Sequence, residues 1–236
     1  MKKLIAILLC MYQVHAICQE KAENSAASFS LNADVVSRYV WRGLLYSPNV
    51  NVQPYAAFSY KGLSLSTWAS YGISDRYAEV DFTLSYAIDN LSVSVNDYYN
   101  EFEDSLGTNR HFNFKDNTTP HALEATLSYK ISETMPLTLS LSSFFYGNDK
   151  DSEGENMYSS YIEASYPFDF SNYSFNLFIG GTLDKGLYAD KAAIVNVGFS
   201  ATRQIKVSDS FQLPFSASLI SNPYAEDIFM VLKLSF

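Results

Sequence analysis

Two arginines stand in a segment that otherwise has the pattern of a β-strand. In SRYVWRGLLYSPN (37–49), Arg38 and Arg42 fall on one face of an extended chain, and Tyr39 and Trp41 fall on the other, because successive side chains of a strand point to opposite faces. A guanidinium is costly in apolar surroundings and requires water or a carboxylate. The pattern therefore predicts a strand between two environments, one wet and one apolar.

Carboxylates recur at the corresponding polar positions of later strand-like segments: Glu79, Asp81, Glu124 and Glu163. The alternation described below predicts that the strands close into a barrel. We predict that these carboxylates then form, with Arg38 and Arg42, a ring of mixed charge in the outer half of the barrel lumen. Three interpretations stay open. The charges could neutralise each other and brace or plug a narrow lumen, form a constriction whose field acts on small polar solutes, or bind a specific ligand. Near the opposite end of the barrel, Lys233 is expected to lie beside Asp34, because closing a barrel pairs its last strand with its first.

The residues available for catalysis are few. After residue 18 the only histidines are His111 and His121, in or beside the longest loop, and neither belongs to a spaced pair with a serine. Outer-membrane hydrolases need a histidine base beside a serine or a carboxylate, so a hydrolase is the least favoured alternative. We predict a protein that is not an enzyme and that has no metal site and no cofactor.

The composition is typical of a membrane barrel, although a secreted β-sandwich would also fit. The 236 residues include 18 Tyr and 17 Phe, and only 17% are charged, below the quarter usual in soluble domains. The net charge of −9 argues against nucleic acid as a partner. The two cysteines lie at positions 10 and 18, which leaves no disulfide framework.

The N-terminus predicts export. Met1-Lys2-Lys3 is followed by the apolar stretch LIAILLCM (4–11) and then by small residues, the pattern of a Sec-type signal peptide. We place the signal peptide at 1–18, with cleavage after Ala16 or Cys18. A short periplasmic segment at 19–27 and a single barrel domain at 28–236 follow. After residue 18 no apolar run is long enough for a membrane helix.

Alternation with period 2 dominates the rest of the chain and predicts an all-β fold. About twelve segments of strand length follow one another, and short connections alternate with longer polar loops. Strands of about 9–11 residues, an even strand count and loops of alternating length are typical of a bacterial outer-membrane barrel. We therefore predict a single up-and-down antiparallel transmembrane barrel of about 12 strands in the bacterial outer membrane.

Aromatic residues on the apolar face are predicted to form girdles against the outer-membrane lipids. They include Tyr39, Trp41, Tyr71, Tyr86, Tyr129 and Tyr166. The chain ends in MVLKLSF, and the terminal Phe236 resembles the signal by which the outer-membrane assembly machinery recognises its clients. Asp97 departs from the pattern, because in simple register it faces lipid; a bulge or a position at the rim would explain it.

Several segments together resemble one family. They are ADVVSRYVWRG (33–43), VQPY (52–55), WASYG (68–72), AEVDFTLSY (78–86), HALEATLSY (121–129) and SNPY (221–224). In this order they resemble the TorF-type porins of Gram-negative outer membranes, over nearly the whole chain after the signal peptide. The resemblance implies an outer-membrane barrel with porin activity, and it does not specify a solute.

We therefore expect a porin-like channel for the passive uptake of small polar solutes, with a lumen of mixed charge. The alternative is a non-conducting barrel with a structural or adhesive role.

Overall fold

The computed structural model describes residues 27–209 and 211–236. The predicted signal peptide and nearly all of the predicted segment 19–27 lie outside these residues. Among the described residues, no helix is both long and apolar enough to cross a membrane.

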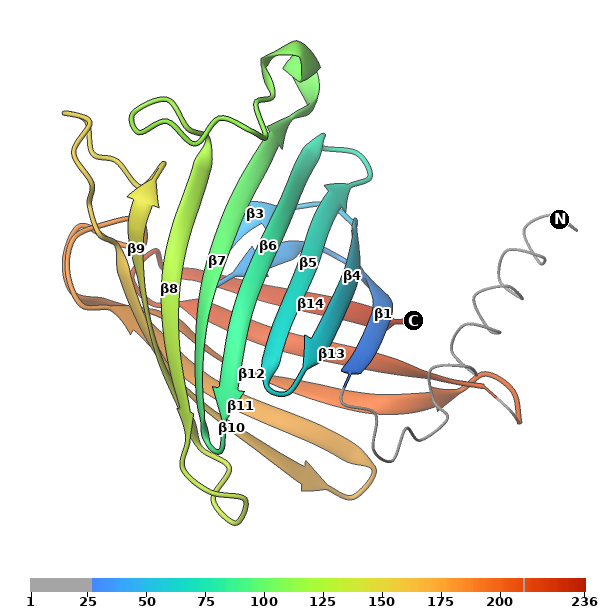
Figure 1. Cartoon of the computed structure of the whole chain (residues 1–236). Coiled ribbons are helices and arrows are strands. Elements are labelled where there is room, and N and C mark those ends of the chain that lie inside the picture. Colours follow the sequence, from blue (N-terminus) through green and yellow to red (C-terminus); the bar gives the residue numbers. More distant parts are fainter. Residues whose placement is uncertain (1–26, 210) are drawn as a thin grey trace, which may run out of the picture.

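Twelve antiparallel strands close into a barrel, as predicted (Figure 1). They are β1 (Ala27–Val36), β4 (Asn51–Tyr60), β5 (Leu63–Gly72), β6 (Tyr77–Ile88), β7 (Leu91–Phe102), β8 (His121–Lys130), β9 (Thr138–Gly147), β10 (Ser160–Phe170), β11 (Tyr173–Thr182), β12 (Ala193–Lys206), β13 (Gln212–Asn222) and β14 (Asp227–Ser235). Wall strands that follow one another in the sequence also pair in the sheet. The barrel is closed by β1, which pairs with both β14 and β4. Closure pairs the backbone groups strand to strand and leaves no open sheet edge.

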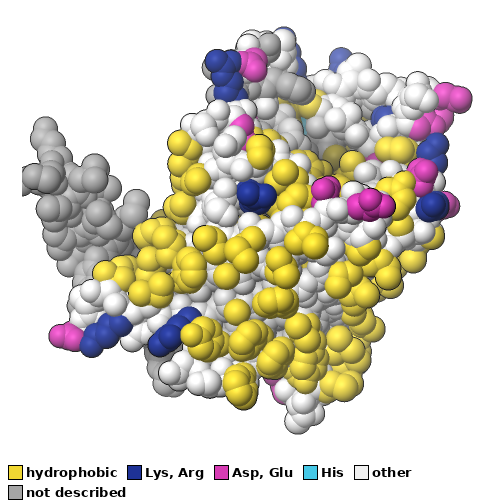
Figure 2. All heavy atoms as spheres, turned by 180° about the vertical axis from the view of Figure 1, so that it is seen from behind, with side chains coloured by type: hydrophobic (Ala, Val, Ile, Leu, Met, Phe, Trp, Pro, Cys, Tyr) yellow, Lys and Arg dark blue, Asp and Glu magenta, His cyan; other side chains and the backbone are white. Residues whose placement is uncertain are grey.

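The two faces of the wall differ in polarity. Along β6, for example, Phe82 and Leu84 point outward and are half exposed, whereas Glu79 and Asp81 point inward and are buried. Apolar side chains cover much of the outer wall, and charges gather toward its two rims (Figure 2). A sheet whose exposed face is apolar and whose enclosed face is polar suits a lipid exterior and a polar interior.

The two ends of the barrel differ in their connections. At one end the strands are joined mostly by tight turns, such as Lys61-Gly62 between β4 and β5, where both residues have positive φ. At the other end lie longer loops, among them 103–120, which begins with the 3₁₀ helix η1 (Glu103–Thr108). This alternation of connection lengths follows the predicted pattern, and we call the two ends the turn end and the loop end.

The first long connection differs from the prediction. We expected one strand to run through Arg42, but β1 ends at Val36, and residues 37–50 leave the wall. They contain β2 (Tyr39–Trp41) and β3 (Leu44–Ser47), which pair only with each other in a small second sheet. Val36 still pairs with Asn51 across the base of this excursion, so the barrel wall is continuous without it. We call residues 37–50 the inner hairpin, because its contacts lie inside the barrel.

Candidate functional site

The inner hairpin crosses the lumen from one wall to the opposite one. Its base lies between β1 and β4, which are neighbours in the closed ring. Its tip residue Arg42 contacts Glu124 on β8, Ser142 on β9 and the ring of Tyr161 on β10. In the strand order β9 and β10 stand opposite the β1–β4 pair. The hairpin therefore spans the barrel and narrows the lumen toward the loop end.

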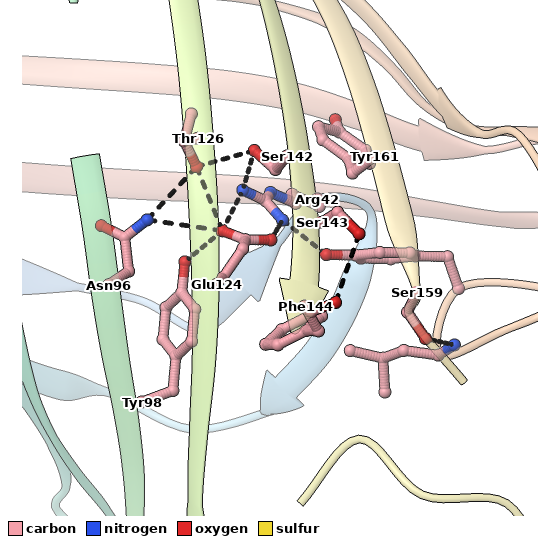
Figure 3. Close-up of polar contacts among 12 residues, drawn as sticks. Arg42, Asn96, Tyr98, Glu124, Thr126, Ser142, Ser143, Phe144, Ser159 and Tyr161 are labelled. Atoms are coloured by element: carbon pink, nitrogen blue, oxygen red, sulfur yellow. Dashed lines mark hydrogen bonds and ion pairs between the residues drawn. The ribbon is translucent and has the colours of Figure 1, made fainter. Parts of the chain in front are cut away.

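An ion pair fastens the tip to the wall (Figure 3). Arg42 donates from Nη1 to Glu124 Oε1 at 2.5 Å and from Nη2 to Glu124 Oε2 at 3.0 Å. The Glu124 side chain has no exposed surface, and Tyr98 Oη donates to its Oε2 at 2.9 Å. Arg42 Nη1 also lies 2.5 Å from Tyr188 Oη. A two-point contact between guanidinium and carboxylate is among the stronger side-chain interactions and fixes the orientation of both groups.

Aromatic rings surround this ion pair. The Arg42 guanidinium carbon lies 4.4 Å from the centroid of the Trp41 ring and 4.5 Å from that of Tyr161, within the range of cation–π attraction. Trp41 packs on Tyr98 and Tyr188 with centroid distances of 5.4 and 5.7 Å. The rings exclude water from the charges, which strengthens the attraction between them.

The turn at the tip explains how the hairpin comes this close to the wall. Trp41 pairs with Leu44 around the two turn residues Arg42 and Gly43, and both have positive φ, 50° and 79°. Two central residues with positive φ define a type I′ turn, whose twist matches that of the flanking strands. A side chain at Gly43 would also collide with the backbone of Val195. Glycine thus meets both a conformational and a steric requirement.

The base of the hairpin is held at the loop end. Ser47 Oγ donates to Asp75 in the loop between β5 and β6, and Asn51 Nδ2 donates to Ser47 Oγ at 2.8 Å. Partial burial acts to raise the pKa of the Asp75 carboxyl. The hydrogen bonds from Ser47 and from the Tyr77 N–H outweigh it, so this pKa lies below its ordinary value. Asp75 therefore binds the hairpin base as a carboxylate.

The predicted ring of charges is reduced to one ion pair. Glu163 accepts from Tyr161 Oη at 2.6 Å and from Asn196, and no described residue gives it an ion pair. Glu79 accepts from Tyr77 Oη at 2.5 Å, and Asp81 accepts from the Tyr99 N–H at 3.3 Å. The expectation that these three carboxylates face arginines is wrong, because tyrosines and backbone donors occupy the positions beside them.

Arg38 has no ion-pair partner among the described residues, and its buried Nε makes no hydrogen bond there. The chain bends at Ser37 and Arg38, so Arg38 belongs to the start of the inner hairpin rather than to the barrel wall. Of the two arginines, only Arg42 reaches a predicted carboxylate.

The girdle positions divide into two groups. Tyr39 and Trp41 were predicted to face lipid, and this is wrong. Tyr39 packs on Trp68 and Tyr77, whose side chains point inward from β5 and β6, with centroid distances of 5.3 and 5.7 Å. The reason is the departure of the chain from the wall after Val36. The other predicted girdle residues are outward-facing and exposed by 38 to 47%: Tyr71, Tyr86, Tyr129 and Tyr166.

Between the inner hairpin and the turn end, small hydroxyl and amide side chains line the inner wall. Neighbouring strands exchange hydrogen bonds there, such as Ser59 to Ser64 at 2.9 Å, and Thr202 with Ser216 at 2.7 Å. Lys233 Nζ lies 3.1 Å from Asp34 Oδ2, so the structure brings the expected pair together where β14 meets β1. Phe236 pairs through its backbone with Ala33, at 2.9 Å from its N–H.

The two histidines form contacts that the sequence did not reveal. His121 Nδ1 lies 2.8 Å from Asp97 Oδ1, and its Nε2 lies 3.0 Å from the carbonyl oxygen of His111. His111 Nε2 in turn lies 2.9 Å from Glu101 Oε1. Both nitrogens of His121 are thus engaged, and neither is free to take a proton from a nucleophile. Asp97 does point outward, as simple register predicts, and His121 is the partner that accommodates it there.

The fold and the site together define a closed twelve-stranded barrel whose lumen is crossed by an inward-folded hairpin. No family model matches the chain, and no curated protein sequence matches it. Among solved structures, an outer membrane channel from Pseudomonas putida F1 is 12% identical, with a TM-score of 0.40 over 92% of this chain and 96% of that one. Salmonella typhi OmpF in complex with daunomycin is 10% identical, with a TM-score of 0.38 over 89% of this chain and 98% of that one. At this level of similarity neither assigns a family.

Proposed function

We propose that this chain is an outer-membrane channel for the passive uptake of small polar solutes, and that the inner hairpin forms its constriction. One observation carries the proposal: a wall that is apolar outside and polar inside encloses a lumen, and a separate two-stranded element lies across it. A barrel that served only to span the membrane would not need a hairpin that leaves the wall and is fastened by a buried ion pair.

The lining suggests the kind of solute. The constriction offers tyrosine hydroxyls and carboxyl groups, and the wall beneath it offers serine, threonine and asparagine. Arg42 at the tip is neutralised by Glu124, and Arg38 at the start of the hairpin is outnumbered by the carboxyl groups of Glu79, Asp81 and Glu163. Such a lumen favours neutral or cationic solutes that exchange hydrogen bonds over anions.

A second function is favoured by the packing of the same hairpin. Tyr188, Tyr161, Phe144 and Val195 are almost wholly buried and form one cluster with Trp41 packed against it. Aromatic packing of this density can hold the lumen shut. The alternative is therefore a non-conducting barrel with a structural or adhesive role.

Removing the hairpin distinguishes the two. Because Val36 pairs with Asn51, residues 37–50 can be replaced by Asn-Gly, which supports a two-residue turn between antiparallel strands. The matched control replaces residues 151–155 by Asn-Gly, between the paired residues Lys150 and Asn156. Single-channel conductance in planar bilayers is the measurement.

We expect the chain to conduct weakly and the variant without the hairpin to conduct several-fold more, with the control unchanged. An intact chain that never conducts, beside a hairpin-free variant that does, would favour the closed barrel. If neither conducts after insertion, the channel proposal fails. Equal conductance in both would remove the hairpin as the constriction.

A further inference from the structure

After η1, the long loop between β7 and β8 lies against the outside of the barrel. Asp97 and Tyr99 share the outward face of β7 with the exposed Val93 and Val95, and Tyr99 pairs with His121 on β8. Loop residues cover this patch: Tyr99 is 1% exposed although its side chain points outward. We call residues 109–119 the outer flap.

Several contacts hold the outer flap to the wall. The Arg110 N–H donates to Tyr99 Oη at 2.8 Å, and the His111 ring stacks on Tyr99 at 3.9 Å. The Phe114 ring stacks on His121 at 4.2 Å, and Tyr146 Oη donates to the Phe114 carbonyl oxygen. The flap therefore has a defined seat on β7, β8 and β9.

The seat is polar, and the flap shields it. His121 lies between two acceptors, the Asp97 carboxyl and the His111 carbonyl oxygen. For both hydrogen bonds to exist, Asp97 and His121 must hold two protons between them, which makes the pair neutral overall. A neutral, covered pair is what an apolar exterior tolerates, because an exposed charge on the lipid face of a barrel is costly.

The outer surface of the flap carries two aromatic side chains between two basic ones. Phe112 is 98% exposed and Phe114 is 46% exposed, and Arg110 and Lys115 are exposed beside them. The carboxylates of the described side chains around this corner are already paired: Asp97 with His121, Glu101 with His111, Asp104 with Arg76 and Asp116 with Lys150. Among the described residues, neither Arg110 nor Lys115 has a carboxylate partner.

We infer that the outer flap is a docking surface for a phosphate-bearing lipid headgroup of the outer leaflet. Arg110 and Lys115 would contact the phosphate, and Phe112 would enter the boundary between headgroup and acyl chains. Nη1 of Arg110 donates to the carbonyl oxygens of Gly107 and Asn109 at 2.6 and 2.9 Å, so the positive charges of Arg110 and Lys115 are not neutralised by any described carboxylate. On a chain of net charge −9, such a pair of cations is complementary to an anionic group. The inference rests on the proposed function, because it requires that this barrel lie in the outer membrane with its loop end outward.

The test is the retention of lipid A by the folded barrel in detergent micelles, measured by native mass spectrometry. The variant is Arg110→Gln/Lys115→Gln, and the matched control is Lys185→Gln/Lys191→Gln, two lysines of the loop between β11 and β12 at the same end. We expect the flap variant to bind lipid A roughly tenfold or more weakly, since each basic residue near an anionic surface contributes about 1 kcal/mol. The control should bind as the unaltered chain does.

Two further binding measurements identify which parts of the lipid the outer flap recognises. Dephosphorylated lipid A should bind the unaltered chain as weakly as lipid A binds the flap variant, and Phe112→Ser should weaken binding of both forms. Equal loss in the flap variant and the lysine control, or no preference for the phosphorylated lipid, would overturn the inference.

A heat-dependent shift in gel migration, together with insertion into bilayers, tests independently of lipid binding whether the chain forms a membrane barrel. If the chain fails to insert, the proposed function fails. If it inserts and conducts but shows no preference for lipid A phosphate, only the docking surface is refuted.

Discussion

Arg42 and Glu124 are 82 residues apart in the chain, yet their side chains meet in two contacts of 2.5 and 3.0 Å. One residue is the tip of the inner hairpin and the other belongs to the far wall of the barrel. Their ion pair holds the inner hairpin across the lumen.

Removing Arg42 should destabilise the barrel, because Glu124 would remain fully buried without its cation. We expect Arg42→Met to lower the free energy of unfolding by about 3–5 kcal/mol, the cost typical of breaking a buried pair from one side. The double variant Arg42→Met/Glu124→Gln should recover much of this loss. Denaturant titration of the refolded protein, followed by circular dichroism, measures both. Arg203→Met is the control, since the side-chain contacts of Arg203 with described residues are an exposed hydrogen bond and a cation–π contact, both with Tyr173; a loss of similar size there would contradict the assignment.

Trp41 should be shielded from lipid, because it lies in the lumen. The chain has two tryptophans, so Trp68→Phe leaves Trp41 as the only one. In bilayers of brominated lipids we expect its fluorescence to be largely unquenched. The control is Trp41→Phe/Trp68→Phe/Tyr86→Trp, whose single tryptophan replaces an outward-facing tyrosine that is 46% exposed and should be strongly quenched. Strong quenching of Trp41 would place it on the lipid face.

The base of the inner hairpin should loosen in acid. The pKa of Asp75 is lower in the folded protein than in the unfolded chain, so its contribution to stability is fully present above the unfolded value, near 4. That contribution is lost as the pH falls through the folded value. The protection of the backbone amides from Ser47 to Asn51 against hydrogen exchange, measured relative to the intrinsic rate at each pH, should therefore fall below pH ~4 in the unaltered chain. Asp75→Asn should exchange faster at neutral pH and respond less to acid; identical pH profiles would argue against this role.

Loss of His121 should release the outer flap. His121→Ala leaves Asp97 without its partner on the outer wall and removes the ring on which Phe114 stacks. We expect trypsin to cleave after Arg110 and Lys115 several-fold faster than in the unaltered chain. Replacing both members, as Asp97→Leu/His121→Leu, should slow cleavage again at least in part, because no unpaired charge remains. Unchanged cleavage in His121→Ala would show that the flap is held by other contacts.

Much of the wall could be predicted from the sequence. The alternation of apolar and polar residues identified the twelve strands, their outward faces and the partnership of β1 with β14, because a period of 2 is imposed by backbone geometry at every position. The contact between Asp34 and Lys233 follows from closure alone. None of these features depends on a long-range packing choice.

The sequence of the inner hairpin contains a local turn signal that the alternation of apolar and polar residues does not detect. Arg42-Gly43 lies between Val40-Trp41 and Leu44-Leu45, and a glycine in a two-residue turn between apolar pairs predicts a hairpin. When this segment is taken as one long strand, the alternation predicts that Tyr39 and Trp41 face lipid. Residues that favour a turn should therefore be considered before the alternation where the two disagree.

What the sequence by itself determined is the barrel: strand number, the two faces and the alternation of short turns with long loops, all set by local periodicity. Only the tertiary structure decided where the connections fold. Residues 37–50 turn inward and join Arg42 to Glu124, while residues 109–119 turn outward and cover the pair of Asp97 and His121. Both outcomes depend on contacts between residues far apart in the chain, and a local pattern does not encode which distant partner a loop will meet.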